Sequence, residues 1–304
     1  MGGAARYLGE LEDWLLRNPT HDIRLVGRGR RLSPWWLVRR ELSWPSGPRV
    51  ALNNVGFVTG GSRRTLLRNA LHFLDDAELA QHGAGLPRTF GTEVRIVRSA
   101  ARRSDELVVP CTAMAERVAR VVPALSDRLV VRHHPLSAPA LSPHSGLPAI
   151  LVPVLFAPYK RMDEHLQRLL DALDRLDIGC VVRPTATRAE LPGLVDHPRI
   201  DLVGHLSPAE VVAEWARSTA AYYPTGLESF GYPLAEARAA GRPIIALDSA
   251  QNLEIAAGAL RGFRPNDPGS LADAVGSALS DPPPAADPSE FHPDHYFDWL
   301  MGDR

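Results

Sequence analysis

The hydrophobic positions of this chain repeat with two periods that alternate along its length. Helical spacing runs from Ala4 to Arg17 and stops at Asn18, directly before a proline. Short apolar runs, typical of buried strands, lie between the helical patterns, and such alternation indicates parallel sheets built from βαβ units. In the first half we expect strand signals at 22–26, apolar runs at 50–57 and 65–73, helix then strand over 95–109, a helix over 113–121 and a strand over 128–131.

A segment with three prolines and no periodicity, 137–148, separates this series from a second one. Ser207-Pro208-Ala209-Glu210 offers an N-cap serine, a proline at the first helical position and a reciprocal glutamate, so we expect a helix to begin there. The other elements expected in the second half are strands over 149–155, 179–183, 200–203, 220–223 and 244–247, a helix over 162–173, and a helix entered through Pro233 and ended by Gly241.

The sequence therefore predicts an α/β protein of two Rossmann-like domains with parallel sheets. We expect the first domain at 1–137, a linker at 138–148, the second domain at 149–285 and a helical tail at 286–304 that docks across the domains.

Composition excludes several classes of protein. Hydrophobic residues at 45% and charged residues at 23% of 304 positions are near globular averages, and no apolar run approaches the roughly 18 residues of a membrane span. A net charge of -1 provides no field that would attract nucleic acid. The two cysteines, Cys111 and Cys180, lie far apart without metal-ligand spacing, which fits a reducing cytoplasm. We expect no integral membrane segment and no nucleic-acid partner.

One lysine stands out among the basic residues. Of the 34 lysines and arginines, Lys160 is the single lysine. A lysine ammonium is compact and mobile where arginine presents a flat fork, so a lone lysine can mark a site that the fork would not fit. The alternative is chance survival on a solvated surface.

The stretch 224–248 gathers the candidate chemistry. Glu228 follows an expected strand, and Glu236 comes eight positions later inside the next helix. Phe230 and Gly231 stand at that helix entrance, where backbone N–H groups and the helix dipole favour an anion. A carboxylate can accept two sugar hydroxyls side by side. The stretch predicts a site for phosphate and sugar, with two exposed surface acids as the alternative.

The Glu-x7-Glu pattern in ESFGYPLAEARAAGRPIIALD resembles the donor-site signature of family 4 (group 1) retaining glycosyltransferases, which have the GT-B architecture of two facing Rossmann-like domains. The resemblance extends to APYKRMDEHLQRLLDAL, VGHLSPAEV and LDSAQNLEIAAG, and more loosely to SDELVVPCTAMAERV. It implies that 1–137 is the acceptor-side domain and that 149–285 binds the nucleotide sugar.

Roles follow from the resemblance position by position. It implies that Glu228 contacts the donor sugar, that Glu236 accepts bonds from the nucleotide ribose, and that Phe230 and Gly231 present backbone N–H groups to the diphosphate. Lys160 would neutralise the same diphosphate. Family members usually also have an arginine five or six positions before this lysine, where this chain has Leu155 and Val154. Either Arg161 supplies that second charge or the leaving group is stabilised less.

Histidines are the remaining candidates. The resemblance implies that His72, in RNALHFL, faces the donor sugar, and a satisfied core histidine is the alternative. His133 and His134 are neighbours on one chain segment, so chelation by the pair is not expected. His205 lies in a loop that the family uses near the nucleobase, mostly through its backbone.

The resemblance implies transfer of a sugar from a nucleotide-diphosphate donor to an acceptor hydroxyl, on a small molecule or a glycan, with retention of anomeric configuration. No cofactor and no metal are called for, because lysine and a helix dipole can replace the cation. The alternatives are a non-catalytic nucleotide-sugar-binding or partner subunit, or a GT-B-like epimerase or phosphorylase; a dehydrogenase lacks its GxGxxG.

The chain begins at a Gly-Gly segment that in the family follows the first β-strand of the amino-terminal domain. We therefore expect that first strand to be missing, with about 5 to 15 residues upstream and a gap in the middle of the first sheet.

Overall fold

The computed structural model describes residues 3–19, 22–29, 33–43, 47–83, 86–138, 141, 146–153, 160–194 and 197–302. The chain forms two compact units, each with one parallel sheet. We call Leu11–His133 the amino-terminal unit, and Met1–Glu10 together with His134–Arg304 the carboxy-terminal unit. Residues 154–159, including Val154 and Leu155, lie outside the described part of the chain, as do the linker residues 139, 140 and 142–145.

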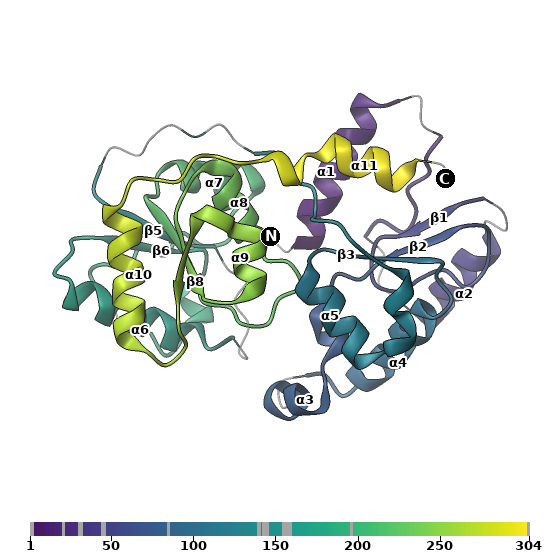
Figure 1. Ribbon diagram of the computed structural model, residues 1–304, viewed down its shortest axis with the longest axis horizontal. Helices are drawn as coiled ribbons and strands as arrows, with labels where there is room; N and C mark the ends of the chain where they lie inside the picture. Colours follow the sequence, from purple (N-terminus) through teal and green to yellow (C-terminus); the bar gives the residue numbers. More distant parts are fainter. Residues whose placement is uncertain are drawn as a thin grey trace. The chain divides into compact units, whose positions relative to one another are not determined.

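The amino-terminal unit contains a four-stranded parallel sheet in the order β1-β2-β3-β4 (Figure 1). The strands pair neighbour to neighbour, so the gap expected in the middle of this sheet is not found among the described strands. The strands are β1 (Arg49–Ala51), β2 (Arg63–Leu66), β3 (Glu106–Val109) and β4 (Leu129–Val131), and the helices are α2 (Pro34–Ser43), α3 (Asp76–His82), α4 (Phe90–Ala101) and α5 (Thr112–Val121).

The strand expected at 22–26 was wrong. Residues 22–27 run without strand pairing, and Ile23 and Leu25 are only half-buried, so their alternation reflects a surface segment with no neighbouring strand. The apolar runs at 50–57 and 65–73 are longer than the strands that they contain, because β1 ends at Ala51 and β2 gives way to a 3-10 turn, η1 (Ala70–Phe73). The other 3-10 turns are η3 (Pro123–Arg128), η5 (Arg188–Glu190), η6 (Ala257–Ala259) and η7 (Ser289–Phe291).

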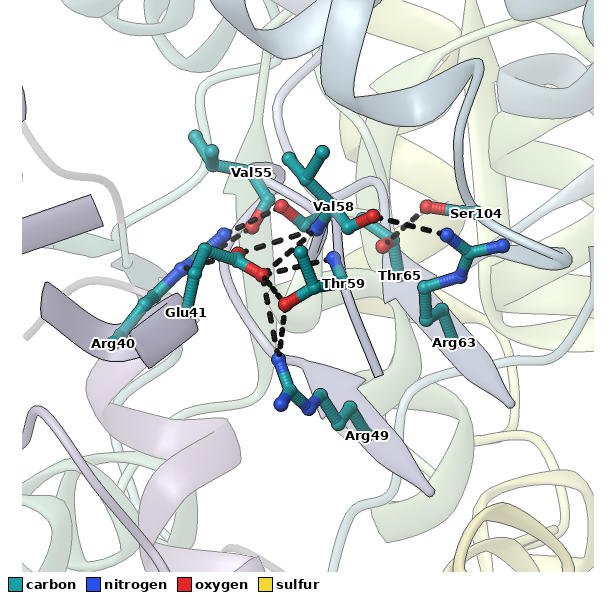
Figure 2. Close-up of polar contacts among 10 residues, drawn as sticks. Arg40, Glu41, Arg49, Val55, Val58, Thr59, Arg63, Thr65 and Ser104 are labelled. Carbon is teal, nitrogen blue, oxygen red and sulfur yellow. Dashed lines mark hydrogen bonds and ion pairs between the residues drawn. The ribbon is translucent and has the colours of Figure 1, made fainter. Parts of the chain in front are cut away.

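A half-buried carboxylate fixes the loop after β1. Figure 2 shows Glu41, on α2, accepting hydrogen bonds from the backbone N–H groups of Val58 (3.2 Å) and Thr59 (2.9 Å) and from the Thr59 hydroxyl (2.7 Å). Arg49 Nη1 lies 3.3 Å from the same carboxylate, and Arg40 donates to the Val55 carbonyl at 3.0 Å. Burial alone would raise the pKa of Glu41, but these hydrogen bonds outweigh it and lower that pKa. The loop is thereby held against α2.

The carboxy-terminal unit contains a five-stranded parallel sheet in the order β6-β5-β7-β8-β9. Its central strands are buried along their whole length, as expected of a parallel sheet covered on both faces. The strands are β5 (Ala149–Val152), β6 (Val181–Pro184), β7 (Ala220–Tyr223), β8 (Ile244–Leu247) and β9 (Leu260–Phe263), and the helices are α6 (Met162–Arg175), α7 (Pro208–Ala216), α8 (Tyr232–Ala240), α9 (Ala250–Ala256), α10 (Pro268–Ser280) and α11 (Pro293–Met301).

The direction of winding reverses inside this sheet. The chain moves from β5 to β6 on one side, and then from β7 through β8 to β9 on the other. Right-handed crossovers place α8 and α9 on one face and α6 on the opposite face. Figure 1 shows α6 and α10 side by side, with α8 and α9 as a second pair.

The second-half expectations were largely correct. The helix at Ser207 has its full capping box, and β7 and β8 have the expected bounds. The segment expected as a strand at 200–203 runs beside β6 without forming a full strand: Ile200 makes an isolated bridge to Val182, and the N–H groups of Asp201 and Val203 donate to the carbonyls of Val182 and Pro184. The hydrophobic pattern of the sequence did not predict α9, β9 or α10.

The division between the units differs from the expected boundary at residue 137. The first ten residues join the carboxy-terminal unit because Tyr7, fully buried at the start of α1 (Gly3–Arg17), packs edge-on against Tyr296 and Phe297 of α11. The tail therefore forms a helix in the same compact unit as residues 1–10. No helix among the described residues is long and apolar enough to cross a membrane.

Candidate donor site in the carboxy-terminal unit

The reversal between β5 and β7 is where the candidate site lies. In open parallel sheets, ligands bind beyond the carboxyl ends of the strands at the point where winding reverses. Lys160 stands in the connection that follows β5, and Glu228 stands in the loop that follows β7. The topology of the sheet therefore brings two sequence-distant loops to one place.

Lys160 and Glu228 form an ion pair. The Lys160 Nζ donates to Glu228 Oε1 at 2.7 Å, and the side chains are 11% and 26% exposed. Glu228 is thus neither fully exposed nor unpaired, and Lys160 is not on a solvated surface. The two exposed-residue alternatives do not hold for this pair.

Tyr223, the last residue of β7, reinforces the position of Glu228. Burial, and then the neighbouring Glu228 carboxylate with which the phenol makes a hydrogen bond, raise the pKa of Tyr223 well above its ordinary value. The phenol therefore stays protonated beside the Glu228 carboxylate. Gln251 Nε2 also donates to the backbone carbonyl of Glu228, at 3.2 Å.

Gly231 shapes the entrance to α8. Its φ of +84° lies in the left-handed region, and a Cβ there would lie 2.9 Å from Leu234 Cδ1 and 3.3 Å from Tyr223 Cε1. Glycine is thus required by both conformation and space. The helix dipole directs positive potential toward this entrance. The ring of Phe230 is buried against His134 and Tyr232, so its backbone alone remains a candidate for ligand contact.

Glu236 is a buried acid, not an exposed helix acid. The residue is 3% exposed, and its Oε2 accepts from the indole Nε1 of Trp215 at 2.8 Å. Its Oε1 forms an ion pair with Nη1 of Arg6. Both oxygens that were expected to bind a ribose are therefore engaged by side chains of the same unit.

Arg161 does not join this group. Its backbone is left-handed, with φ +48°, and its side chain is 67% exposed. The guanidinium makes a two-point contact with Glu164, at 2.5 Å for each bond. The expectation that Arg161 supplies a second charge beside Lys160 is therefore not supported, because Glu164 one turn along already neutralises it.

His72 lies in the amino-terminal unit, within η1. It is 3% exposed, and its Nε2 is 2.9 Å from Glu93 Oε1. Burial, the largest effect, lowers the pKa of His72 despite the opposing influence of Glu93. Because a carboxylate can only accept, a neutral His72 carries its proton on Nε2 and leaves Nδ1 unprotonated. This environment favours the core-histidine alternative.

Two other candidate histidines also contact side chains of the protein. His134 stacks on Tyr232 in the aromatic cluster around Phe230, and His205 pairs with Glu190 at 2.8 Å on the surface. No group of three His, Cys, Asp or Glu side chains suited to a metal occurs in the described ranges.

Sequence reasoning missed Tyr223, Trp215 and Arg6. Tyr223 directly precedes the Glu228 loop, and its polar head at the carboxyl end of an apolar strand was a usable signal. Trp215 and Arg6 reach Glu236 through tertiary contacts only, 21 and 230 positions away in sequence, and no local pattern reports such contacts.

Part of the chain matches a known protein family. Residues 156–281 match the family model described as glycosyl transferases group 1. Glycogen synthase of Mycobacterium tuberculosis (strain CDC 1551 / Oshkosh) is 28% identical over 220 residues, which are 67% of this chain and 53% of that protein. The chain thus spans about half the length of the curated relatives it matches.

Solved structures resemble the whole chain. WaaG, a glycosyltransferase involved in lipopolysaccharide biosynthesis, gives a TM-score of 0.65 at 13% identity, covering 100% of this chain and 97% of WaaG. Sucrose-phosphate synthase from Thermosynechococcus elongatus gives 0.57 at 16%, covering 92% and 78%. A variant of S. aureus TarM, in complex with fondaparinux, alpha-GlcNAc-glycerol and UDP, gives 0.56 at 11%, covering 74% and 45%.

The fold defined by these likenesses and by the two parallel sheets is the GT-B fold of glycosyltransferases. The segment that matches the group 1 family model, residues 156–281, contains Lys160, Glu228 and Glu236.

Proposed function

We propose that this protein transfers a sugar from a nucleotide-diphosphate donor to an acceptor hydroxyl, with retention of anomeric configuration. The observation that carries the proposal is the Lys160–Glu228 pair at the reversal point of the sheet, beside the entrance to α8. The family match over the same segment and the UDP present in the TarM structure support it. The acceptor is a small molecule or a glycan.

Each group has a separate task in this reaction. The bond from the anomeric carbon to the phosphate oxygen breaks, and negative charge grows on the departing diphosphate. Lys160 and the dipole of α8 stabilise that charge without a metal ion. Glu228 holds the hydroxyls of the donor sugar and is not a nucleophile. The acceptor oxygen attacks the same face of the sugar and gives its proton to the leaving phosphate, which yields the glycoside and a nucleoside diphosphate.

The pairing of Lys160 with Glu228 fits this division of tasks. A lysine ammonium has three donors on a mobile stem, so it can exchange a carboxylate for a phosphate oxygen without moving the backbone. Glu228 keeps the hydrogen bond from Tyr223 when Lys160 turns away. We propose that the reaction takes place in the cytoplasm, where the buried thiols of Cys111 and Cys180 stay reduced.

A turnover assay tests the proposal. UDP-, GDP-, ADP- and TDP-sugars are incubated with the protein and an acceptor library, and release of the nucleoside diphosphate is measured. We expect release with one donor class, an anomeric proton signal of unchanged configuration in the product, and a loss of about 100-fold in kcat for Lys160→Met. Nucleotide binding without turnover of any donor would favour the non-catalytic subunit instead.

A further inference from the structure

Arg6 is the second cation of the carboxy-terminal unit near the donor site. Its Nη1 is paired with Glu236 Oε1, and its side chain is 20% exposed where that of Glu236 is 4% exposed. The guanidinium therefore lies between a buried carboxylate and solvent. A guanidinium has five N–H donors, and this ion pair uses one terminal nitrogen.

The first turns of α1 lie along the first turns of α8. A Cβ added at Gly3 would lie 3.2 Å from Tyr232 Cδ2, on the first residue of α8. One turn further along each helix, Arg6 meets Glu236. Tyr7 packs on His134, which in turn stacks on Tyr232. Three successive contacts thus fix Arg6 beside the helix whose entrance faces the diphosphate in the proposed reaction.

The charges of the site require a second cation. Burial raises the pKa of the Tyr223 phenol, and Glu228 and Glu236 both lie close enough to raise it further. Lys160 pairs with the first of these two carboxylates. Without Arg6, the group formed by Lys160, Glu228 and Glu236 carries a net negative charge. A terminal phosphate leaves with about two negative charges, which such a site would repel. Arg161 cannot correct the balance, because Glu164 holds it at the surface. With Arg6, the charges of Lys160, Arg6, Glu228 and Glu236 sum to zero. Each cation can then turn from its carboxylate to the phosphate.

We propose that Arg6, from the amino-terminal helix, binds the donor diphosphate as the second cation beside Lys160. This inference rests on the proposed function. The pairing with Glu236 holds the guanidinium ready, and the fork geometry of arginine then suits two phosphate oxygens at once. Glu236 would bind the ribose and Arg6 the phosphate, which are adjacent parts of the same nucleotide. One bound nucleotide would therefore replace the ion pair with contacts to both residues.

Calorimetry and ligand-observed NMR can separate this role from a structural one. The nucleoside diphosphate that wild type binds best among UDP, GDP, ADP and TDP is compared with the nucleoside of the same base. For Arg6→Ala we expect the diphosphate affinity to fall at least about tenfold and the nucleoside affinity to change less than about twofold. Arg6→Lys keeps a positive charge but loses the fork, so its diphosphate affinity should lie between those of wild type and Arg6→Ala. Arg161→Ala, the matched removal of a nearby arginine, should change neither affinity.

Three other outcomes would overturn the proposal. Equal losses for diphosphate and nucleoside would mean that Arg6 only positions Glu236. Unchanged diphosphate affinity in a folded Arg6→Ala variant would remove Arg6 from the site while leaving the proposed function intact. Failure of wild type to bind any of the four diphosphates would overturn the proposed function together with this role. If Arg6→Ala does not fold, Arg6→Lys takes its place: a loss of diphosphate affinity without a loss of nucleoside affinity supports the proposal, and an unchanged diphosphate affinity overturns it.

Discussion

Trp215→Phe isolates one interaction of the buried acid Glu236. The change removes the indole N–H that lies 2.8 Å from Glu236 Oε2 and retains an aromatic ring at a position that is 1% exposed. A hydrogen bond to a charged group contributes about 2 kcal/mol, and loss of part of the ring adds a cavity cost. We expect Trp215→Phe to destabilise the carboxy-terminal unit by about 3 kcal/mol.

A double-mutant cycle with Glu236→Gln separates the hydrogen bond from the cavity. Charge-assisted hydrogen bonds are about twice as strong as neutral ones, so we expect a coupling free energy of about 1 kcal/mol between the two changes. The loss of the charged partner of Arg6 occurs in both arms that contain Glu236→Gln and cancels from the cycle.

Urea unfolding followed by circular dichroism measures the four free energies. Both residues belong to the carboxy-terminal unit, so one transition reports on all four proteins even where the two units unfold separately. Additivity within about 0.4 kcal/mol would refute the reasoning, because it would mean that the indole does not bind the carboxylate in solution.

Three further predictions follow from single contacts. Gly231→Ala places a Cβ at a φ of +84° and 2.9 Å from Leu234 Cδ1, so we expect a loss of at least about 1 kcal/mol in thermal unfolding, whereas Gly258→Ala, with open space around its Cβ, serves as the control. Glu41→Gln should lower the free energy of unfolding by about 2 kcal/mol at pH 7. Because the pKa of Glu41 is lowered in the folded state, the difference between variant and wild type should shrink as the pH falls through that pKa. A difference that does not depend on pH would contradict a role for the charge of Glu41. The pKa of His72 is lowered in the folded state, so the unfolded chain binds a proton at a higher pH than the folded one, and wild type should lose stability from pH 8 to pH 5. Urea unfolding should show a smaller loss for His72→Gln over that range. An identical loss would contradict the conclusion that His72 is a buried core histidine.

The fold was predictable where burial on both faces left a continuous apolar signal. The strands β7 and β8 match their expected bounds, because each of their residues packs against a helix or a neighbouring strand. The same signal failed at 22–26, where alternation without a partner strand produces no sheet. Strand pairing is a tertiary property, so short runs cannot distinguish the two cases.

The sequence predicted those site residues that belong to its motifs. Glu228, Gly231 and Glu236 stand within one sequence pattern and Lys160 in a second one, and the reversal of the sheet explains why Lys160 and Glu228 meet. The partners of Glu236 were not predictable, because Arg6 arrives from the far end of the chain and Trp215 looks like an ordinary core residue. Arg161 was a reasonable choice in sequence, but a left-handed backbone and Glu164 direct it elsewhere.

Thermal unfolding with nucleotides tests the central claim most directly. A ligand that binds only the folded state stabilises it by about 2.7 kcal/mol at a hundredfold excess over Kd. We predict that one of UDP, GDP, TDP and ADP raises the Tm of wild type, and that the same nucleotide has little effect on Lys160→Met, which lacks the ammonium now 2.7 Å from Glu228. A cooperative unfolding transition that none of the four nucleotides shifts would contradict a nucleotide-sugar site in the carboxy-terminal unit.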